Sequence, residues 1–446
     1  MAQLQSRQIS QLHLYRVLHA VRLAPEPISR AQIGEQTGLS QPAVSSLTRR
    51  LLESGALAEV GARPSLGGGR RERELAINPE HAWVVGVKVS LHQLTISLAD
   101  FAGGVRNTVV LPLAAPYTGS ALVRLMARRI EAFLAEAGGS VRERLAGVGV
   151  AVPGFIDSMQ GEVHWSAVLR GAHGDVPVPL AHLLTRALGV PVLIENDANM
   201  LALAEQWFGQ AARLSNVAVV TLEHGLGLGL VLNGELYRGH SGLAAELAHL
   251  QVETEGHACR CGKRGCLETL VTHDAVVREA RAAGVLPPAA SDAGAESFEA
   301  VVAAFAALVE RARGGDAKAN AIFQRHGRLL GQWLGNVVNL LAPQLVILDG
   351  GGVVAADLYE GALRQAMEAA MVLPHRGRVA LAVRHRGDEV WARGAASLVL
   401  QRLDESAEIV ESVSRHGFEN ESVGRRPDFG ALVDDGARPA PIDRSR

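Results

Sequence analysis

The chain has 446 residues, of which 48% are hydrophobic and 20% charged, and its formal net charge is −2. This length predicts two or three domains of an ordinary globular protein. The net charge excludes a globally basic nucleic-acid binder, although it allows a basic module. The chain starts with a polar stretch and holds no apolar run of about 18 residues. We therefore expect no signal peptide, no membrane span and a cytoplasmic location.

Residues 1–80 predict a winged helix-turn-helix domain. Apolar residues recur with helical spacing over 12–21. A short helix over 30–38 then follows its cap Ser29 and ends at a glycine. A third helix, over 41–55, begins with small polar residues. A short helix, a glycine-containing turn and a helix of this kind form the helix-turn-helix pattern.

The outward face of the third helix can reach base edges and phosphates. Residues 56–78 predict a β-hairpin with a basic, glycine-rich tip, which would be the wing. Residues 1–80 hold ten Arg and seven Glu but no Lys or Asp, so this module has a net charge of +3. That charge supports DNA contact, and the alternative is a small helical dimerisation domain. The residues expected to contact DNA are Gln41, Ser45, Ser46, Thr48, Arg49, Arg70 and Arg71.

Residues 81–402 alternate strands with helices, which predicts α/β layers. A polar, aperiodic segment follows over 403–446, and we expect it to be a disordered tail. Within the α/β region the pattern predicts strands at 83–90, 94–100, 106–114, 145–154, 191–197, two within 216–239, 343–352 and 379–387, and helices at 120–137, 179–188, 199–209, much of 276–371 and 392–403.

All three cysteines of the chain lie within eight residues, at Cys259, Cys261 and Cys266, and His249 precedes the first by ten. One imidazole and three thiolates complete the tetrahedral set that structural zinc (Zn²⁺) prefers. Disulfides explain an odd number of cysteines poorly. The remaining alternative is three unpaired thiols that lie near a histidine by chance.

Carboxylates flank this cluster, with Glu246 three residues before His249 and Glu268 two residues after the last cysteine. A metal at the cluster would hold both near one point, where they can accept hydrogen bonds from sugar hydroxyls. Asn196 and Asp197 stand where a predicted strand meets a helix, which is where open α/β sheets bind ligands. The alternatives are solvated surface acids for the first pair and a helix cap for the second.

The stretches IENDANMLALAE and LNGELYRG, the glycine-rich turn before the latter, and the pattern E-x2-H-x9-C-x-C-G-x2-G-C-L-E resemble the ROK family (repressors, open reading frames, kinases) over residues 81–402. The resemblance implies a two-lobed, actin-like ATPase and sugar-kinase fold. The preceding winged helix-turn-helix resembles the arrangement of the family's transcriptional repressors. By the same resemblance, Asn196, Asp197, Glu246, His249 and Glu268 hold sugar hydroxyls, and His249, Cys259, Cys261 and Cys266 hold zinc.

Two phosphate-binding loops of the family's kinases are altered in this chain. The first loop, Asp-x-Gly-Gly-Thr in kinases, has Lys88 at its acidic position and Leu91 in place of a glycine. The second, Gly-Thr-Gly-x-Gly-Gly-Gly, has His224 and Leu228 at two of its positions. We therefore expect sugar binding without phosphorylation and no catalytic residue. Asp197 would be the base if the chain were a kinase.

The sequence thus predicts a sugar-responsive transcriptional repressor of carbohydrate metabolism genes. We expect operator DNA and a sugar or sugar derivative as partners, and a homodimer that reads two half-sites, with a tetramer left open. The alternatives are a ROK-type kinase that phosphorylates hexoses and carries a fused DNA-binding domain, and a cleft that binds a partner protein. Family members carry Gly-Trp where this chain has Gly171 and Ala172, so the identity of the sugar stays open.

Overall fold

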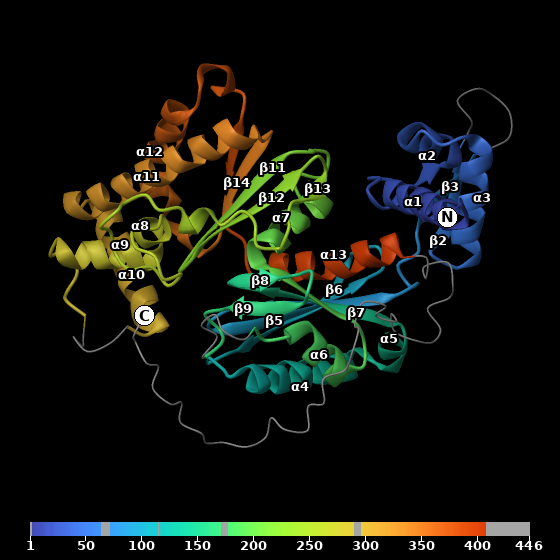
Figure 1. The fold of residues 1–446 in the computed structure, drawn as a ribbon, viewed down its shortest axis with the longest axis horizontal. Helices are drawn as coiled ribbons and strands as arrows, with labels where there is room; N and C mark the ends of the chain where they lie inside the picture. Colours follow the sequence, from blue (N-terminus) through green and yellow to red (C-terminus); the bar gives the residue numbers. More distant parts are fainter. Residues whose placement is uncertain (1, 64–71, 115, 171–176, 290–295, 407–446) are drawn as a thin grey trace, which may run out of the picture.

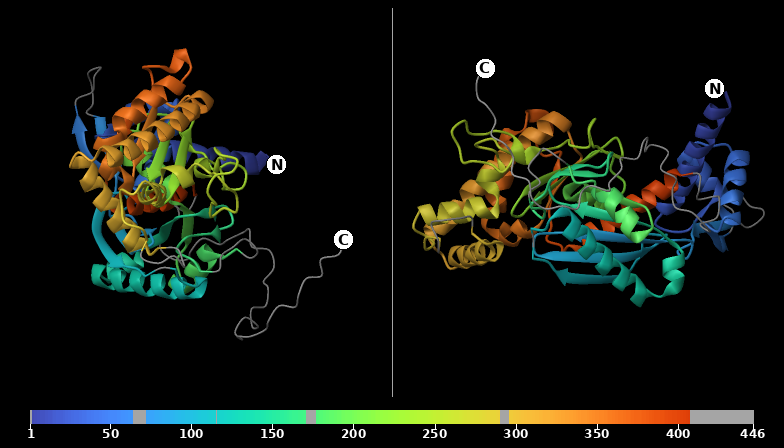
Figure 2. Two further views of the ribbon diagram at one scale, coloured as in Figure 1. Left: turned by 90° about the vertical axis from the view of Figure 1, so that its left-hand side faces the viewer. Right: turned by 60° about the horizontal axis from the view of Figure 1, so that its bottom comes forward.

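The computed structural model describes residues 2–63, 72–114, 116–170, 177–289 and 296–406. A small N-terminal domain is followed by two α/β lobes, and the N-terminal domain lies at one end of the molecule (Figure 1). The right-hand view of Figure 2 shows the same separation. Among the helices so described, none is long and apolar enough to cross a membrane.

The N-terminal domain has the predicted helix-turn-helix. Ser29 caps α2 through a complete capping box, in which its hydroxyl accepts from the backbone of Gln32 at 3.4 Å and the Gln32 side chain accepts from the Ser29 backbone at 2.9 Å. The helix ends at Gly38, whose φ of 67° suits glycine. The elements are α1 (Ala2–Arg22), β1 (Ile28–Ser29), α2 (Arg30–Thr37), α3 (Gln41–Glu53), β2 (Leu57–Arg63) and β3 (Glu72–Ile77), with the strands in the order β1-β3-β2.

The outward face of α3 is as expected except at one position. Thr48 was predicted to face DNA, and this is wrong, because its side chain is fully buried. Its hydroxyl donates to the carbonyl of Val44 at 2.8 Å and accepts from Nε of Arg30 at 3.0 Å. Thr48 is four residues after buried Val44, so it shares the inward face. Gln41, Ser45, Ser46 and Arg49 are exposed, whereas Arg70 and Arg71 lie outside the described residues.

Lobe 1 is built on a five-stranded sheet in the order β10-β7-β4-β5-β6. Its strands β4, β7 and β10 are parallel, so their carboxyl ends meet at one edge. A short hairpin, β8 and β9, occupies the loop after β7, where no strand was predicted. The elements are β4 (Trp83–Val89), β5 (Gln93–Asp100), β6 (Val105–Pro112), α4 (Gly119–Ala137), α5 (Gly139–Glu143), β7 (Leu145–Val152), β8 (Phe155–Asp157), β9 (Glu162–Trp165), α6 (Leu180–Leu188) and β10 (Val192–Asn196).

Lobe 2 has a second five-stranded sheet in the order β13-β12-β11-β14-β15. Its elements are β11 (Val217–Leu222), β12 (Leu226–Leu232), β13 (Glu235–Leu236), η1 (Leu247–His249), α8 (Glu268–Val271), α9 (His273–Ala282), α10 (Phe298–Arg313), α11 (Ala317–Leu341), β14 (Leu345–Asp349), η2 (Gly351–Ala355), α12 (Ala356–Ala370), η3 (Leu373–His375) and β15 (Ala380–Val383).

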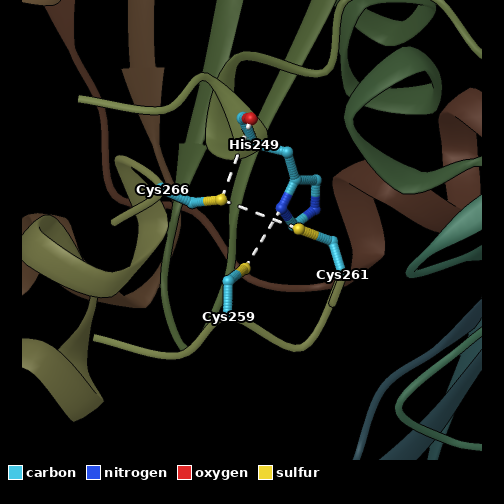
Figure 3. A group of neighbouring side chains, drawn as sticks. All are labelled: His249, Cys259, Cys261 and Cys266. Atoms are coloured by element: carbon cyan, nitrogen blue, oxygen red, sulfur yellow. Dashed lines mark hydrogen bonds between the residues drawn. The ribbon is translucent and has the colours of Figure 1, made fainter. Parts of the chain in front are cut away.

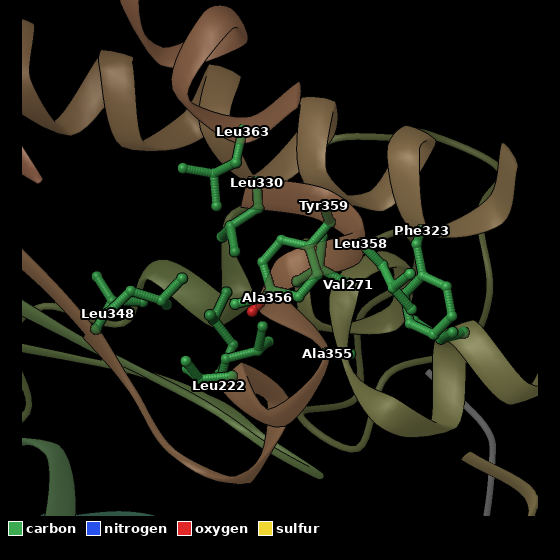
Figure 4. Packing of buried hydrophobic residues seen from close by; sticks show 14 of the residues in the cluster. Leu222, Val271, Phe323, Leu330, Leu348, Ala355, Ala356, Leu358, Tyr359 and Leu363 are labelled. Carbon is green, nitrogen blue, oxygen red and sulfur yellow. The ribbon is translucent and has the colours of Figure 1, made fainter. Parts of the chain in front are cut away.

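The core of lobe 2 joins its sheet to its helices. Leu222 and Leu348 from the strands face Leu330 and Leu363 from α11 and α12 (Figure 4). Tyr359 lies among them, and its hydroxyl donates to the carbonyl of Gly352 at 3.2 Å. The hydroxyl of Tyr359 therefore has a partner although its ring lies among apolar side chains.

Two long helices, α7 (Asp197–Phe208) and α13 (Glu389–Glu405), lie between the two lobes (Figure 1). The helix α13 lies directly on the sheet of lobe 1, because a Cβ on Gly149 of β7 would overlap the carbonyl of Ala395. In the same way α7 lies on the sheet of lobe 2, because a Cβ on Gly229 of β12 would overlap the carbonyl of Ala198. The molecule is thus layered as sheet, α13, α7, sheet.

The two central helices also touch each other, since a Cβ on Gly394 of α13 would overlap the carbonyl of Met200 on α7. At its far end α13 continues to Glu405, and Leu403 and Asp404 are buried. The first residues of the predicted tail are therefore helical. The rest of that tail, 407–446, lies outside the described residues.

The contact between α13 and lobe 1 predicts a strong effect of one methyl group. Gly149→Ala should lower the free energy of unfolding by about 1–3 kcal/mol, because the new Cβ must displace backbone rather than a flexible side chain. Urea unfolding measures this. Gly139→Ala is the matched control, since no atom lies within 4 Å of its Cβ position. Equal stability of the two variants would contradict the layered packing.

Candidate functional site

All five residues predicted to hold a ligand line one cleft between the lobes. Asn196, Asp197, Glu246, His249 and Glu268 surround a cavity of about 140 Å³. The first two come from the end of β10 and the start of α7, at the carboxyl edge of the sheet of lobe 1. The other three come from lobe 2. The cleft therefore brings side chains from both lobes to a place where they can contact a single bound ligand.

Asn196 has a structural role as well as a place in the cleft. Its side-chain oxygen accepts from the backbone of Ala198 at 2.8 Å and of Asn199 at 3.4 Å, so it caps α7. Its amide nitrogen donates to the carbonyl of Gly154 at 3.0 Å. The helix-cap alternative is thus correct for Asn196, and these bonds also fix the position of Asp197.

The carboxylate of Asp197 is held by an ammonium group from lobe 1. Nζ of Lys88 lies 2.5 Å from Oδ2 of Asp197, and both side chains are largely buried. Burial alone would lower the pKa of Lys88, but the carboxylates of Asp197, Asp388 and Glu223 raise it above its ordinary value. Lys88 therefore stays charged, and Asp197 is engaged in an ion pair.

Two further carboxylates lie at the lobe 2 side of the cleft. Burial, with Glu268 and Asp197 nearby, raises the pKa of Glu246 to about 7. Oε2 of Glu246 lies 3.9 Å from Nε2 of His249. Ala245, just before it, has a φ of 66°, a conformation that non-glycine residues rarely adopt. A partly buried carboxylate in such a fixed position is a suitable acceptor for hydroxyl groups.

The predicted metal ligands form a compact cluster beside the cleft. His249, Cys259, Cys261 and Cys266 each offer one donor atom, and these atoms all lie within 4.8 Å of one another (Figure 3). Nδ1 of His249 lies 3.4 Å from the sulfur of Cys259, and the sulfurs of Cys261 and Cys266 are 3.6 Å apart. Tetrahedral bonds of about 2.3 Å would separate two sulfurs by about 3.8 Å. The donor set and its spacing therefore fit a tetrahedral metal ion.

His249 connects the cluster to the cleft. Its Nδ1 faces the cysteines, whereas its Nε2 is the atom nearest to Glu246. Burial lowers the pKa of His249 to about 4, so the ring is neutral and can serve as a metal ligand at one nitrogen. Glu268 also lies beside the cluster, with Oε1 3.4 Å from the sulfur of Cys259.

Two residues of the second altered phosphate loop, Glu223 and His224, contact other parts of the chain. The carboxylate of Glu223 accepts from the backbone of Gly351 at 2.9 Å. The ring of Phe298, from the start of α10, lies 4.3 Å from the ring of His224 and 4.8 Å from that of His92, between centroids. Because His92 belongs to lobe 1 and Phe298 to lobe 2, this aromatic stack bridges the cleft.

Several cleft residues were missed from the sequence. Arg260 lies between two metal ligands, pairs with Glu268 at 3.0 Å and faces the ring of Trp165 at 5.7 Å. Its place inside the Cys-x-Cys motif was a usable signal. Phe298 gave no such signal, because its contacts with His92 and His224 join segments that lie far apart in the sequence.

The sequence matches a known protein family over most of its length. The ROK family signature matches residues 84–402. The chain belongs to the ROK family. One ROK relative, the N-acetylglucosamine repressor of Escherichia coli O157:H7, is 28% identical over 381 residues, which cover 84% of this chain and 89% of the relative.

Solved ROK structures share the fold. A ROK family transcriptional regulator, a homologue of the E. coli MLC protein, superposes with a TM-score of 0.74 at 24% identity and covers 91% of this chain and 99% of its own. A ROK glucokinase from Streptomyces griseus in complex with glucose and AMPPNP gives a TM-score of 0.59 at 26% identity and covers 71% and 99%. Regulators and kinases of the family thus share this architecture.

The metal cluster predicts a specific loss. Cys266→Ser should weaken metal affinity by more than about 10–100-fold, because the loss of a residue that only supports a metal ligand already has an effect of that size. The variant should also have a lower melting temperature. Elemental analysis and thermal unfolding of the purified protein measure both. His257→Ala is the control, because this exposed imidazole lies in the same loop but outside the cluster. Equal metal content in both variants would count against the site.

Proposed function

We propose that this chain is a sugar-responsive transcriptional repressor that binds a sugar in its cleft without phosphorylating it. The ion pair between Lys88 and Asp197 carries the proposal. The base of a sugar kinase must accept a proton from the sugar hydroxyl, whereas this carboxylate already faces a buried ammonium 2.5 Å away. The repressors among the relatives support the same function.

The nucleotide side of the cleft supports binding without transfer. Phosphoryl transfer depends on positioning the phosphates and neutralising their charge. Here the side chain of Glu223 already accepts from the backbone N–H of Gly351, a donor that a phosphate oxygen would otherwise use. The aromatic stack of His92, Phe298 and His224 adds bulk in the same region. A triphosphate would meet a carboxylate and three rings in this region.

The sugar side of the cleft retains its polar groups. Glu246, Glu268 and Nε2 of His249 offer acceptors and a donor to hydroxyls. The metal that we infer at the cluster is zinc, held by His249, Cys259, Cys261 and Cys266. When bound, it would fix the ring of His249 and the start of α8, and thus the carboxylate of Glu268. The effector class is therefore a sugar or sugar derivative rich in hydroxyls.

The N-terminal domain supplies the DNA-binding surface of the proposed repressor. Gln41, Ser45, Ser46 and Arg49 are exposed on one helix, whose opposite face packs into the domain core. One such helix reads a half-site, so we propose a homodimer on a palindromic operator.

A gel-shift assay tests this function. The full-length protein should retard DNA that it selects from a random library, and N-acetylglucosamine or glucose should release it. No retardation at low salt would overturn the proposal. A coupled ADP-release assay with the same sugars examines the kinase alternative. Turnover at the roughly 1–100 s⁻¹ of ordinary kinases would favour that alternative.

Arg49 should contact a phosphate, because its guanidinium is exposed and its pairing with Glu53 at 3.9 Å is loose. Arg49→Ala should weaken DNA binding on all sequences and reduce the slope of affinity against salt concentration by about 1. Arg128→Ala, an exposed arginine on α4 of lobe 1, is the control and should leave the slope unchanged. An unchanged slope for both variants would exclude Arg49 from the interface.

Above pH 7, where the carboxyl of Glu246 is ionised, Glu246→Gln should weaken sugar binding by roughly 10–100-fold, because a charged acceptor of hydroxyl hydrogen bonds becomes a neutral amide of equal size (about 1.5–3 kcal/mol). Calorimetry with N-acetylglucosamine and glucose measures the loss. Glu255→Gln, an exposed carboxylate in the metal-binding loop, should bind as the parent chain does. Unaltered affinity in Glu246→Gln would remove Glu246 from the site.

A further inference from the structure

A buried arginine connects the N-terminal domain to the two central helices. Arg22, the last residue of α1, donates from Nε and Nη2 to the two oxygens of Asp404 on α13, at 2.7 Å each. The two side chains are 1% and 0% exposed. Arg22 also donates to the carbonyl of Phe101, at the end of β5. Its guanidinium lies 4.6 Å from the centroid of the Phe101 ring and 5.4 Å from that of Trp207 on α7.

Arg22 therefore contacts both central helices at once. Asp404 belongs to α13, and Trp207 belongs to α7. A planar guanidinium with its fork on a carboxylate and its faces near two rings has little freedom to turn. This geometry requires Asp404 and Trp207 to keep one relative position.

The opposite ends of the same helices lie in the cleft. The helix α7 begins at Asp197, and α13 carries Trp391 in its first turn, where both line the cavity. There Lys88 pairs with Asp197 and lies 5.4 Å from the Trp391 ring. A cation thus joins α7 and α13 at each end, with Lys88 at the cleft and Arg22 at the N-terminal domain.

The two helices belong to different lobes. Close backbone packing fixes α13 to the sheet of lobe 1 and α7 to the sheet of lobe 2, as the glycine contacts at Gly149 and Gly229 require. A change in the angle between the lobes must therefore shift α7 relative to α13. Such a shift separates Trp207 from Asp404 and disturbs the contacts of Arg22.

We propose that Arg22 is the residue through which occupancy of the cleft changes the position of the DNA-binding domain. This inference rests on the proposed function. When a ligand changes the lobe angle, α7 turns against α13 about the close backbone contact of Gly394 with Met200. Trp207 then moves relative to Asp404, and Arg22 cannot keep Asp404 and both rings together. The N-terminal domain is then released from its position, and the spacing of the two recognition helices in a dimer changes. Arg22 acts by position alone and touches neither sugar nor DNA.

The test removes the charged contact while keeping the volume. The double variant Arg22→Met with Asp404→Leu replaces the buried pair by apolar side chains, an exchange that folded proteins often tolerate, whereas a single substitution would leave a buried charge unpaired. In the parent chain, N-acetylglucosamine or glucose should reduce operator affinity by a factor within the roughly 5–150-fold usual for coupled sites. In the double variant the sugar should still bind, by calorimetry, but should no longer change operator affinity.

A matched control uses another arginine–aspartate pair. Arg313→Met with Asp357→Leu removes an exposed bidentate pair between α10 and α12, far from the N-terminal domain. This variant should keep the full response to sugar. If sugar releases both double variants from DNA to the same extent as the parent chain, the proposed role of Arg22 is wrong.

A second experiment tests the same coupling without sugar. Phe298→Ala removes the aromatic stack that bridges the lobes, so it should alter operator affinity in the parent chain and have no effect in the Arg22→Met, Asp404→Leu background. Additive effects would overturn the inference. So would a parent chain whose operator affinity responds neither to sugar nor to Phe298→Ala. Failure of the parent chain to bind any DNA would instead overturn the proposed function.

Discussion

The buried ammonium of Lys88 determines what the cleft between the lobes can do. It neutralises Asp197, the carboxylate at the start of α7, and it lies among three carboxylates that keep it charged. A pocket with this charge arrangement can still offer hydrogen bonds to hydroxyls from Glu246 and Glu268. The proposal of binding without phosphorylation follows from the pair of Lys88 and Asp197, because transfer of a phosphoryl group needs a base that is free to accept a proton.

The sequence predicted the architecture well because its signals were local. Capping at Ser29, the glycine at 38 and the alternation of strands with helices each depend on neighbouring residues, and the structure confirms them. The cysteine spacing was informative for the same reason. Three ligands within eight residues leave few arrangements other than a cluster around one point.

What the sequence did not predict depends on contacts between distant segments. The pairing of Lys88 with Asp197 joins residues 109 apart, and Arg22 with Asp404 joins residues 382 apart. Neither pair has a periodic or motif signal. The prediction for Thr48 failed for a different reason. Its polar side chain suggested an exposed position, whereas its spacing of four residues from buried Val44 places it on the inward face of the helix. The helical spacing was the better guide, because Thr48 is buried.

The shared imidazole of His249 has a consequence for how the protein would respond to its surroundings. One of its nitrogens faces the cysteine cluster and the other faces the cleft, so two occupancies depend on one ring orientation. Linkage between binding events is reciprocal, so an ion that orders this ring would strengthen sugar binding by the same factor by which the sugar would strengthen binding of the ion. On the proposed function, protein with an empty cluster would therefore need a higher sugar concentration for the same release from DNA.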